Sequence, residues 1–332
     1  MQQEIRFATF NVCNLALPGA VCYDNLAPYT EAEFEAKTSW IAQQLDFMDA
    51  DVIGFQEIFS QAALQHALAK STRYAHAQQV GFDPVARNGK LTPSVALVSR
   101  LPLVGEVKAY SELPCQLSVA LPIAGARDAE TCFARPILHV KVALSSTLIV
   151  DVIVVHLKSQ RPDYAEGENE DDLYQPGLGS LRSLIRRGTE ALGLRYLLTD
   201  LVQRNRLPLV VMGDFNDVAG AITSRIVMGD GRHSNDGFDD RLFDGYRIQS
   251  QPTPLRHVGY STIHHGQFET IDHILVSEEF NPTSRFAVGE VLEVIYLNDH
   301  VQLRLPEASD HGQVLMRVKL YGIDNVADGI EC

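Results

Sequence analysis

Acidic, amide and imidazole side chains stand at the ends of apolar, strand-like segments of this 332-residue chain. Asp214 and Asn216 follow the run 208–212 within Gly-Asp-Phe-Asn-Asp, and His311 closes a Ser-Asp-His triplet further on. Residues two apart on an extended chain face the same way, so the carboxylate and the amide are expected to share a pocket. The alternative is a plain strand-exit turn, since these residue types also form turns. In a pocket, they predict metal-assisted chemistry at phosphorus.

Oxygen ligands for a metal are also predicted nearer the N-terminus. Glu57 follows the buried run Val-Ile-Gly-Phe-Gln and is the candidate main ligand, although a glutamate that begins a helix would look the same. Asn11 closes the predicted strand 5–11, and Asn14 comes shortly after it. Hard cations such as Mg²⁺ prefer carboxylate and amide oxygens. A lone asparagine at a strand end is otherwise a turn residue.

Histidines recur at the same kind of position. His156 ends the strand 148–156 and is predicted to donate a proton or contact a phosphoryl oxygen, unless it is a buried structural residue. Asp272 alternates with His273, so Asp272 is predicted to orient a distant imidazole and His273 to be structural. The pair 310–311 is preferred over the similar triplet 298–300, because a clear strand follows it directly.

The elements that must position these residues are strands mixed with helices. A capping box, Thr30 with Glu33, predicts a helix start, and helices are also expected over 61–70 and 181–202. Residues 160–179 and 229–270 are expected to be loop-rich. No linker or internal repeat divides the chain. We therefore expect one α/β (α+β) domain over 1–332, with two packed sheets and helices outside. The predicted strands are 5–11, 52–56, 95–98, 107–110, 136–142, 148–156, 209–212, 271–276 and 313–320.

Bulk properties restrict the function. The net charge of −14 argues against a broad DNA-coating surface, because phosphate affinity comes mainly from Lys and Arg. Five cysteines without a CxxC pattern argue against a zinc knuckle and favour reduced thiols. The polar N-terminus shows no signal peptide, which predicts a cytoplasmic protein, although secretion stays open if a leader was removed. No apolar run is long enough for a membrane span, and no obligate protein partner is indicated.

Taken in order, six segments resemble the endonuclease/exonuclease/phosphatase superfamily, which has the DNase-I-like fold. The resemblance implies a four-layer sandwich of two mixed β-sheets packed face to face with helices outside, and hydrolysis of phosphoesters with Mg²⁺ or Mn²⁺. His-Leu-Lys-Ser stands where the abasic-site repair branch carries a tyrosine segment, and is more similar to bacterial extracellular nucleases and phosphodiesterases. The segments are residues 9–12, 55–57, 155–159, 213–217, 270–274 and 309–311.

The resemblance also implies roles. One or two metal ions would be bound by Glu57, with Asn11 beside it and Asp310 contributing. Asp214 would activate the attacking water, and Asn216 would help to position that water or the phosphate.

By the same resemblance, His311 would stabilise the phosphoryl group or transfer a proton. Asp272 would orient His311. His156 would be the candidate acid for the leaving group.

Two substrate classes are retained, and a nuclease is preferred. Lys158, Asn14 and Arg182 are the candidate substrate-binding residues, and Lys158, Arg182 and neighbouring arginines (161, 186 and 187) are expected to form a basic strip. The alternative is a phosphatase or phosphodiesterase for a small molecule or lipid headgroup, which suits the acidic balance and the acidic loop. A non-catalytic binding module is disfavoured, because every expected polar residue is present.

Overall fold

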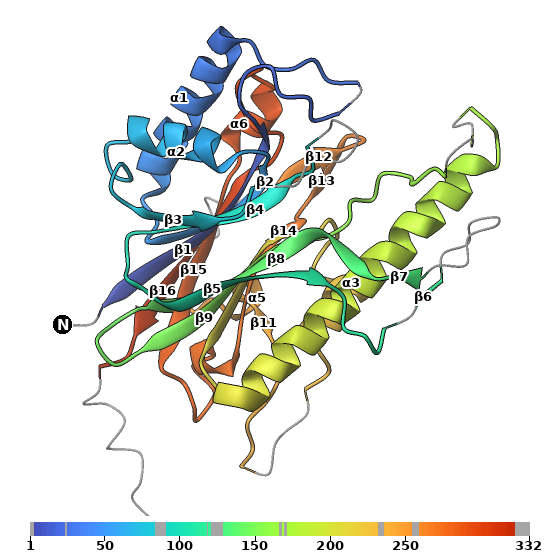
Figure 1. The fold of residues 1–332 in the computed structure, drawn as a ribbon. Helices are drawn as coiled ribbons and strands as arrows, with labels where there is room; N and C mark the ends of the chain where they lie inside the picture. Colours follow the sequence, from blue (N-terminus) through green and yellow to red (C-terminus); the bar gives the residue numbers. More distant parts are fainter. Residues whose placement is uncertain are drawn as a thin grey trace, which may run out of the picture.

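A computed structural model describes residues 3–23, 25–83, 91–117, 119–120, 129–165, 168, 171–231, 236–253 and 259–322. Within them, two six-stranded sheets pack face to face, with α1 and α2 outside one sheet and α3 outside the other (Figure 1). This arrangement confirms the predicted four-layer α/β sandwich. None of the described helices combines the length and apolar character needed to cross a membrane.

The first sheet is mixed, because β1 pairs in parallel with β2 and antiparallel with β16. Its strands, in spatial order, are β15 (Gly289–Leu297), β16 (Gln313–Leu320), β1 (Glu4–Leu15), β2 (Val52–Ile58), β4 (Ser94–Ser99) and β3 (Gln78–Gly81).

The second sheet is also mixed, with β9 and β10 parallel and the remaining pairs antiparallel. In spatial order it contains β11 (Phe243–Asp244), β14 (Asp272–Val276), β10 (Leu209–Asp214), β9 (Ile149–His156), β8 (Cys132–Ala143) and β5 (Leu103–Glu112). Two small hairpins lie apart from the sheets: β6 (Val119–Ala120) with β7 (Ala129–Glu130), and β12 (Thr262–His264) with β13 (Gln267–Glu269).

The predicted helices are present, with one start that differs from the prediction. Ahead of α1 (Glu31–Met48), the Thr30 hydroxyl accepts the backbone N–H of Glu33 and the Glu33 carboxylate accepts that of Thr30, which confirms the capping box. The helix predicted to start at residue 181 is α3 (Gln175–Asn205); it starts earlier because Pro176 occupies its first turn, where the missing N–H is harmless. The other helices are α2 (Gln61–Lys70), α4 (Ile222–Met228), α5 (Gly245–Ile248), α6 (Asp299–Leu303) and the 3₁₀ turn η1 (Glu278–Phe280).

Apolar side chains fill three layers. One core lies between the sheets and takes alternate residues from both, such as Val154 and Met212. A second core lies between the first sheet and helices α1 and α2, and a third between the second sheet and α3 with α4. Both faces of each sheet are therefore covered, which explains why the central strands are nearly continuous apolar runs.

Two expectations were wrong in detail. The strand β15 was not predicted, because Gly289–Leu297 has no clean alternation and its pairing with β16 shifts register near Glu293. Parts of the predicted loop regions are ordered, since 229–270 contains β11, α5 and the β12–β13 hairpin, and α3 begins before residue 179. Residues 166, 167, 169, 170, 232–235 and 254–258 of those regions lie outside the described residues.

Candidate active site

Three of the predicted residues occupy one row of the second sheet. The register places Asp214 opposite His156 on one side and opposite Asp272 on the other. Strands β9 and β10 end at this row and the antiparallel β14 begins there. Two residues further along each of these strands, the side chain packs in the core between the sheets. His156, Asp214 and Asp272 therefore point into the layer between the sheets, at one end of the sandwich.

The first sheet supplies Asn11 and Glu57 at the same end. Simple alternation would place Glu57 beside Phe55, on the face covered by the helices. Instead the pairing of β2 shifts register between Gln56 and Ile58, and Glu57 has a left-handed backbone with φ of 62°. Such irregularities re-aim side chains next to active sites. This one is consistent with the Glu57 carboxylate turning into the cleft.

An amide joins the two sheets. Asn11 Nδ2 donates to Asp214 Oδ2 at 3.1 Å and to Glu57 Oε1 at 3.5 Å. The backbone N–H of Asn14 donates to Glu57 Oε2 at 2.9 Å. Cys13, Asn14 and Asn216 also have positive φ values, of 55°, 59° and 53°. Left-handed backbone at non-glycine residues is energetically unfavourable, and it recurs here at the strand ends that carry the candidate residues.

His311 is held by a carboxylate and by its own main chain. Its Nδ1 lies 2.8 Å from Asp272 Oδ2, and its backbone N–H donates to Ser309 Oγ at 3.0 Å. The ring of His300, from the competing triplet, bonds to the carbonyl oxygen of His311 at 2.8 Å. The triplet 298–300 therefore supports the Asp310–His311 segment rather than replacing it.

Both imidazoles approach the Asp214 carboxylate. Oδ2 of Asp214 lies 3.5 Å from Nε2 of His156 and 4.0 Å from Nε2 of His311. The backbone N–H of Asn216 donates to the other oxygen, Oδ1, at 2.8 Å. The Asn216 side chain donates to the carbonyl oxygen of Leu157 at 2.9 Å and so ties the ends of β9 and β10 together.

The two histidines are driven to opposite charge states. Burial alone would lower the pKa of His311, but the carboxylates of Asp272, Asp214 and Asp310 outweigh burial and raise that pKa well above its usual value. Burial lowers the pKa of His156 well below its usual value, and the charges of Arg135 and His311 act in the same direction. At neutral pH, His311 is therefore cationic and His156 neutral.

Asp214 holds its proton more tightly than an ordinary aspartate. Burial and the neighbouring Asp272 carboxylate raise the pKa of Asp214, against the opposing effect of His311. A carboxylate with a raised pKa in a cleft is suited to accept a proton near neutral pH.

Two groups of side chains could hold a divalent ion. The first contains Glu57 and Asp310, which line the cleft, together with Asn14 Oδ1, a buried oxygen that has no hydrogen-bond partner among the described residues. The second contains Asp214, Asp272 and His311, whose ligand atoms all lie within 4.8 Å of one another. The first offers only oxygens, which fits a hard cation such as Mg²⁺. In the second, Asp272 and His311 are already bonded to each other.

These residues meet in a cleft of about 920 Å³. Asn11 and Asp272 lie behind its wall, and Arg182 is not part of its lining. The lining also contains residues that the sequence did not single out, among them Arg135 and Tyr23. Of the predicted site residues, those that line the cleft are Asn14, Glu57, His156, Lys158, Asp214, Asn216, Asp310 and His311.

The predicted basic strip along α3 is not an open surface. Arg182 is buried and paired with Glu168, with Nη2 to Oε1 at 2.7 Å. Arg186 pairs with Asp163 at 3.1 Å, and Arg187 pairs with Asp217 at 3.2 Å. Each positive charge is thus matched by a carboxylate from the loops beside the helix.

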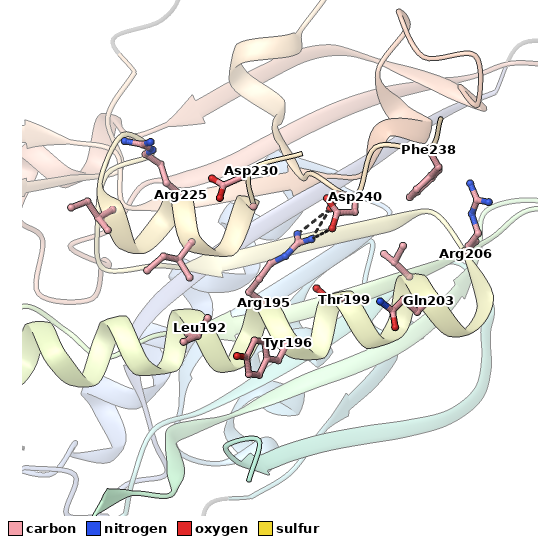
Figure 2. A pocket seen from close by; sticks show the side chains of 14 residues that line it. Leu192, Arg195, Tyr196, Thr199, Gln203, Arg206, Arg225, Asp230, Phe238 and Asp240 are labelled. Carbon is pink, nitrogen blue, oxygen red and sulfur yellow. Dashed lines mark hydrogen bonds and ion pairs between the residues drawn. The ribbon is translucent and has the colours of Figure 1, made fainter. Parts of the chain in front are cut away.

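A larger groove, of about 1090 Å³, lies between α3 and α4 (Figure 2). One of the arginines that line it, Arg195, donates a hydrogen bond to Asp240 Oδ2 at 2.7 Å. Arg225 and Asp230 also line it (Figure 2). None of the strand-end carboxylates, amides or imidazoles described above lines it, so the smaller cleft is the candidate site.

Comparisons with known proteins agree with this geometry. A model of the endonuclease/exonuclease/phosphatase family matches residues 8–311. A solved structure of a member of that family from Bacteroides thetaiotaomicron aligns over 97% of this chain and 99% of its own, at 16% identity and a TM-score of 0.58.

Two further solved structures share the fold. A mannosyl-6-phosphatase from the same bacterium aligns over 95% of this chain and 99% of its own, at 17% identity and a TM-score of 0.57. The human nocturnin catalytic domain with bound sulfate aligns over 96% and 98%, at 16% identity and a TM-score of 0.57. No curated protein sequence matches the chain.

Proposed function

This chain belongs to the endonuclease/exonuclease/phosphatase family, and on that premise we propose that it is a divalent-metal-dependent phosphoester hydrolase. The observation that carries the proposal is the bridge from Glu57 through Asn11 to Asp214, which joins the two sheets beside the Asp272–His311 pair. It supports the proposal, because it brings a carboxylate that would bind the metal, an acid that would accept a proton and a cationic imidazole together, as phosphoester hydrolysis requires.

Glu57 and Asp310 would hold the ion, with Asn11 beside them and Asn14 Oδ1 as a further oxygen. This group is preferred over Asp214, Asp272 and His311, because Asp272 is fully buried and already bonded to His311. A bound divalent ion would polarise a phosphoryl oxygen and make water more acidic.

The remaining side chains accept a proton, stabilise charge or donate a hydrogen bond to the phosphoryl group. Asp214, with its raised pKa, accepts a proton from the attacking water. Cationic His311, held by Asp272, stabilises the negative charge that develops on the phosphoryl oxygens. His156 donates a hydrogen bond to a phosphoryl oxygen; because its pKa is lowered it is neutral, and so it carries no imidazolium proton to give to the leaving group.

The surroundings of the cleft favour a small phosphoester over nucleic acid. The nuclease hypothesis relied on a basic strip, and the arginines of that strip on α3, Arg182, Arg186 and Arg187, are ion-paired. A polyanion would have to displace the paired carboxylates. The cleft itself is lined by the cations Arg135, Lys158 and Arg161, which a single substrate group could reach.

A substrate panel tests the proposal. The protein is assayed on bis-p-nitrophenyl phosphate, p-nitrophenyl phosphate, sugar phosphates and single-stranded and plasmid DNA, with Mg²⁺, with Mn²⁺ and with excess chelator. We expect metal-dependent hydrolysis of the small esters, lost with chelator and in Glu57→Ala. Cleavage of DNA alone would support the nuclease alternative. Hydrolysis that survives chelation would overturn the metal-dependent proposal.

A further inference from the structure

Three cations on one wall of the cleft have no acidic partner within the described residues. Arg135, Lys158 and Arg161 line the cleft, and no carboxylate of a described residue forms an ion pair with them, although Asp163 and Glu190 act on Lys158 from a longer distance. Most other described arginines do form such pairs, including Arg186 beside them. In a chain with a net charge of −14, three neighbouring cations that form no ion pair with a described carboxylate are unusual.

Two of these cations are partly withdrawn from water. Among the described residues, the Lys158 ammonium donates hydrogen bonds to uncharged oxygens only. These are the carbonyl oxygen of Arg161 and the hydroxyl of Ser183, each at 3.3 Å, and the carbonyl and hydroxyl oxygens of Ser159 at 3.3 and 3.4 Å. Arg135 Nη1 donates to the carbonyl oxygen of Leu157 at 3.2 Å. A partly buried cation without a counter-ion is unfavourable unless an anion reaches it.

A buried glutamate holds this wall through the main chain, and its charge acts on Arg135 and Lys158 without forming an ion pair with either side chain. Glu190, on α3, is 3% exposed. Its Oε2 accepts the backbone N–H of Lys158 at 2.7 Å, and its Oε1 accepts that of Ala134 at 2.8 Å. The carboxylate thus clamps the start of β8 to the end of β9. Both oxygens are engaged by the main chain, so the side chains of Arg135 and Lys158 stay available to a ligand.

The wall adjoins the reacting centre. Arg135 is close enough to His156 for its charge to lower the pKa of that imidazole. Lys158 follows His156 by two residues, and Arg161 lies further out along the same loop. An anion held here would therefore lie beside the phosphate undergoing hydrolysis and not in its place.

We propose that Arg135, Lys158 and Arg161 form a second anion subsite, and that the substrate is a small phosphoester carrying a second phosphate group. This inference rests on the proposed hydrolase function. Arg135 and Arg161 would bind the second phosphate through their guanidinium forks, and Lys158 would contribute a point charge.

Competition against a reporter reaction tests the proposal. Hydrolysis of bis-p-nitrophenyl phosphate with saturating Mg²⁺ is measured in the presence of fructose 6-phosphate, fructose 1,6-bisphosphate or a single-stranded DNA oligonucleotide. We expect the bisphosphate to inhibit about 10–100-fold more strongly than the monophosphate, as one or two charge-assisted hydrogen bonds would give. In Arg161→Gln and Arg135→Met, that ratio should fall towards one.

Arg225→Gln is the matched control, because Arg225 is an exposed arginine outside the cleft, at the groove between α3 and α4 (Figure 2). It should keep the wild-type ratio. A ratio near one in the wild-type protein, or one that survives both substitutions, would overturn the subsite. An oligonucleotide that competes better than the bisphosphate, and loses this advantage in Arg161→Gln, would overturn the small-substrate class. Absence of any metal-dependent reporter hydrolysis would instead refute the proposed function itself.

Discussion

The Asp272 carboxylate lies 2.8 Å from Nδ1 of His311, although 39 residues separate them in the chain. The contact fixes which ring nitrogen faces Asp272, and it leaves Nε2 directed towards Asp214 at 4.0 Å. It is also one reason why the pKa of His311 is raised against the effect of burial. Orientation and charge of this imidazole thus depend on one buried aspartate.

Replacing that aspartate should impair catalysis more than folding. In Asp272→Asn the His311 pKa should fall, because the nearest negative charge is removed while burial remains. Activity that requires the imidazolium is present below this pKa and lost above it, so the alkaline limb of the pH–rate profile should move to lower pH. We expect kcat to fall by about 10²–10⁴-fold.

Asp151→Asn is the control for this change. Asp151 is a second buried aspartate paired with a histidine, His139, at 2.6 Å, and neither residue lines the cleft. It should leave the shape of the pH–rate profile unchanged. If Asp272→Asn also leaves the profile unchanged, His311 does not act as a cation.

Binding of a second phosphate should weaken as the pH rises through about 8. Burial lowers the pKa of Lys158 to about 8; the charges of Arg135 and Arg186 act in the same direction, and those of Asp163 and Glu190 oppose it. Lys158 is therefore charged below this pH and neutral above it. The phosphate groups are already dianionic above about pH 7, since their second pKa is about 6. The inhibition constant of fructose 1,6-bisphosphate should therefore rise between about pH 7 and 9. Lys158→Arg, which stays charged, should flatten this dependence.

Removing the buried clamp should disturb substrate binding without removing a cation. In Glu190→Gln, only one amide oxygen remains to accept two N–H groups, and the amide nitrogen faces the other donor. We expect KM for small phosphoesters to rise about 3–30-fold, from the loss of one buried hydrogen bond. Glu190→Asp, which keeps two acceptor oxygens, should recover part of the loss. Equal loss of kcat in both variants, with KM unchanged, would contradict a positioning role.

The close contact of β9 with β10 requires a glycine before Asp214. Gly213 has φ of 152°, and an added Cβ would lie 2.0 Å from the carbonyl oxygen of Val155. Gly213→Ala should therefore destabilise the protein by roughly 2–5 kcal/mol, from steric overlap and backbone strain. Gly220, where an added Cβ meets nothing within 4 Å, gives the control Gly220→Ala. Urea unfolding measures both, and equal stabilities would refute the close contact.

Much of the site could be predicted because its residues close strands. His156, Asp214 and Asp272 end or begin clear apolar runs, and register alone then brings them into one row. Glu57 was predicted from its position at the end of a strand. The register shift and the left-handed backbone found at Glu57 were not predicted. Such irregularities depend on pairing between strands and leave no periodic signal.

The cationic wall was harder to predict. Glu190 carries a weak signal, because it is a charged residue on the buried face of α3, near Ala191 and Leu194. Arg135 precedes the predicted strand 136–142 and shows no pattern of its own. Arg182 was predicted to bind substrate because of its spacing, whereas its partner Glu168 lies in a loop whose path the sequence does not determine.

Metal binding by the glutamate at the end of β2 is the central claim, and Mn²⁺ titration by calorimetry measures it directly. Wild-type protein, Glu57→Gln, Asp272→Asn and the control Glu269→Gln, which alters an acid elsewhere in the cleft, are compared at one pH. We predict that Glu57→Gln weakens Mn²⁺ binding by about tenfold or more, as loss of a carboxylate ligand should, while the other two bind within about threefold of the wild type. Unchanged Mn²⁺ affinity in Glu57→Gln, with a large loss in Asp272→Asn, would contradict the account and move the ion to the Asp214–Asp272–His311 group.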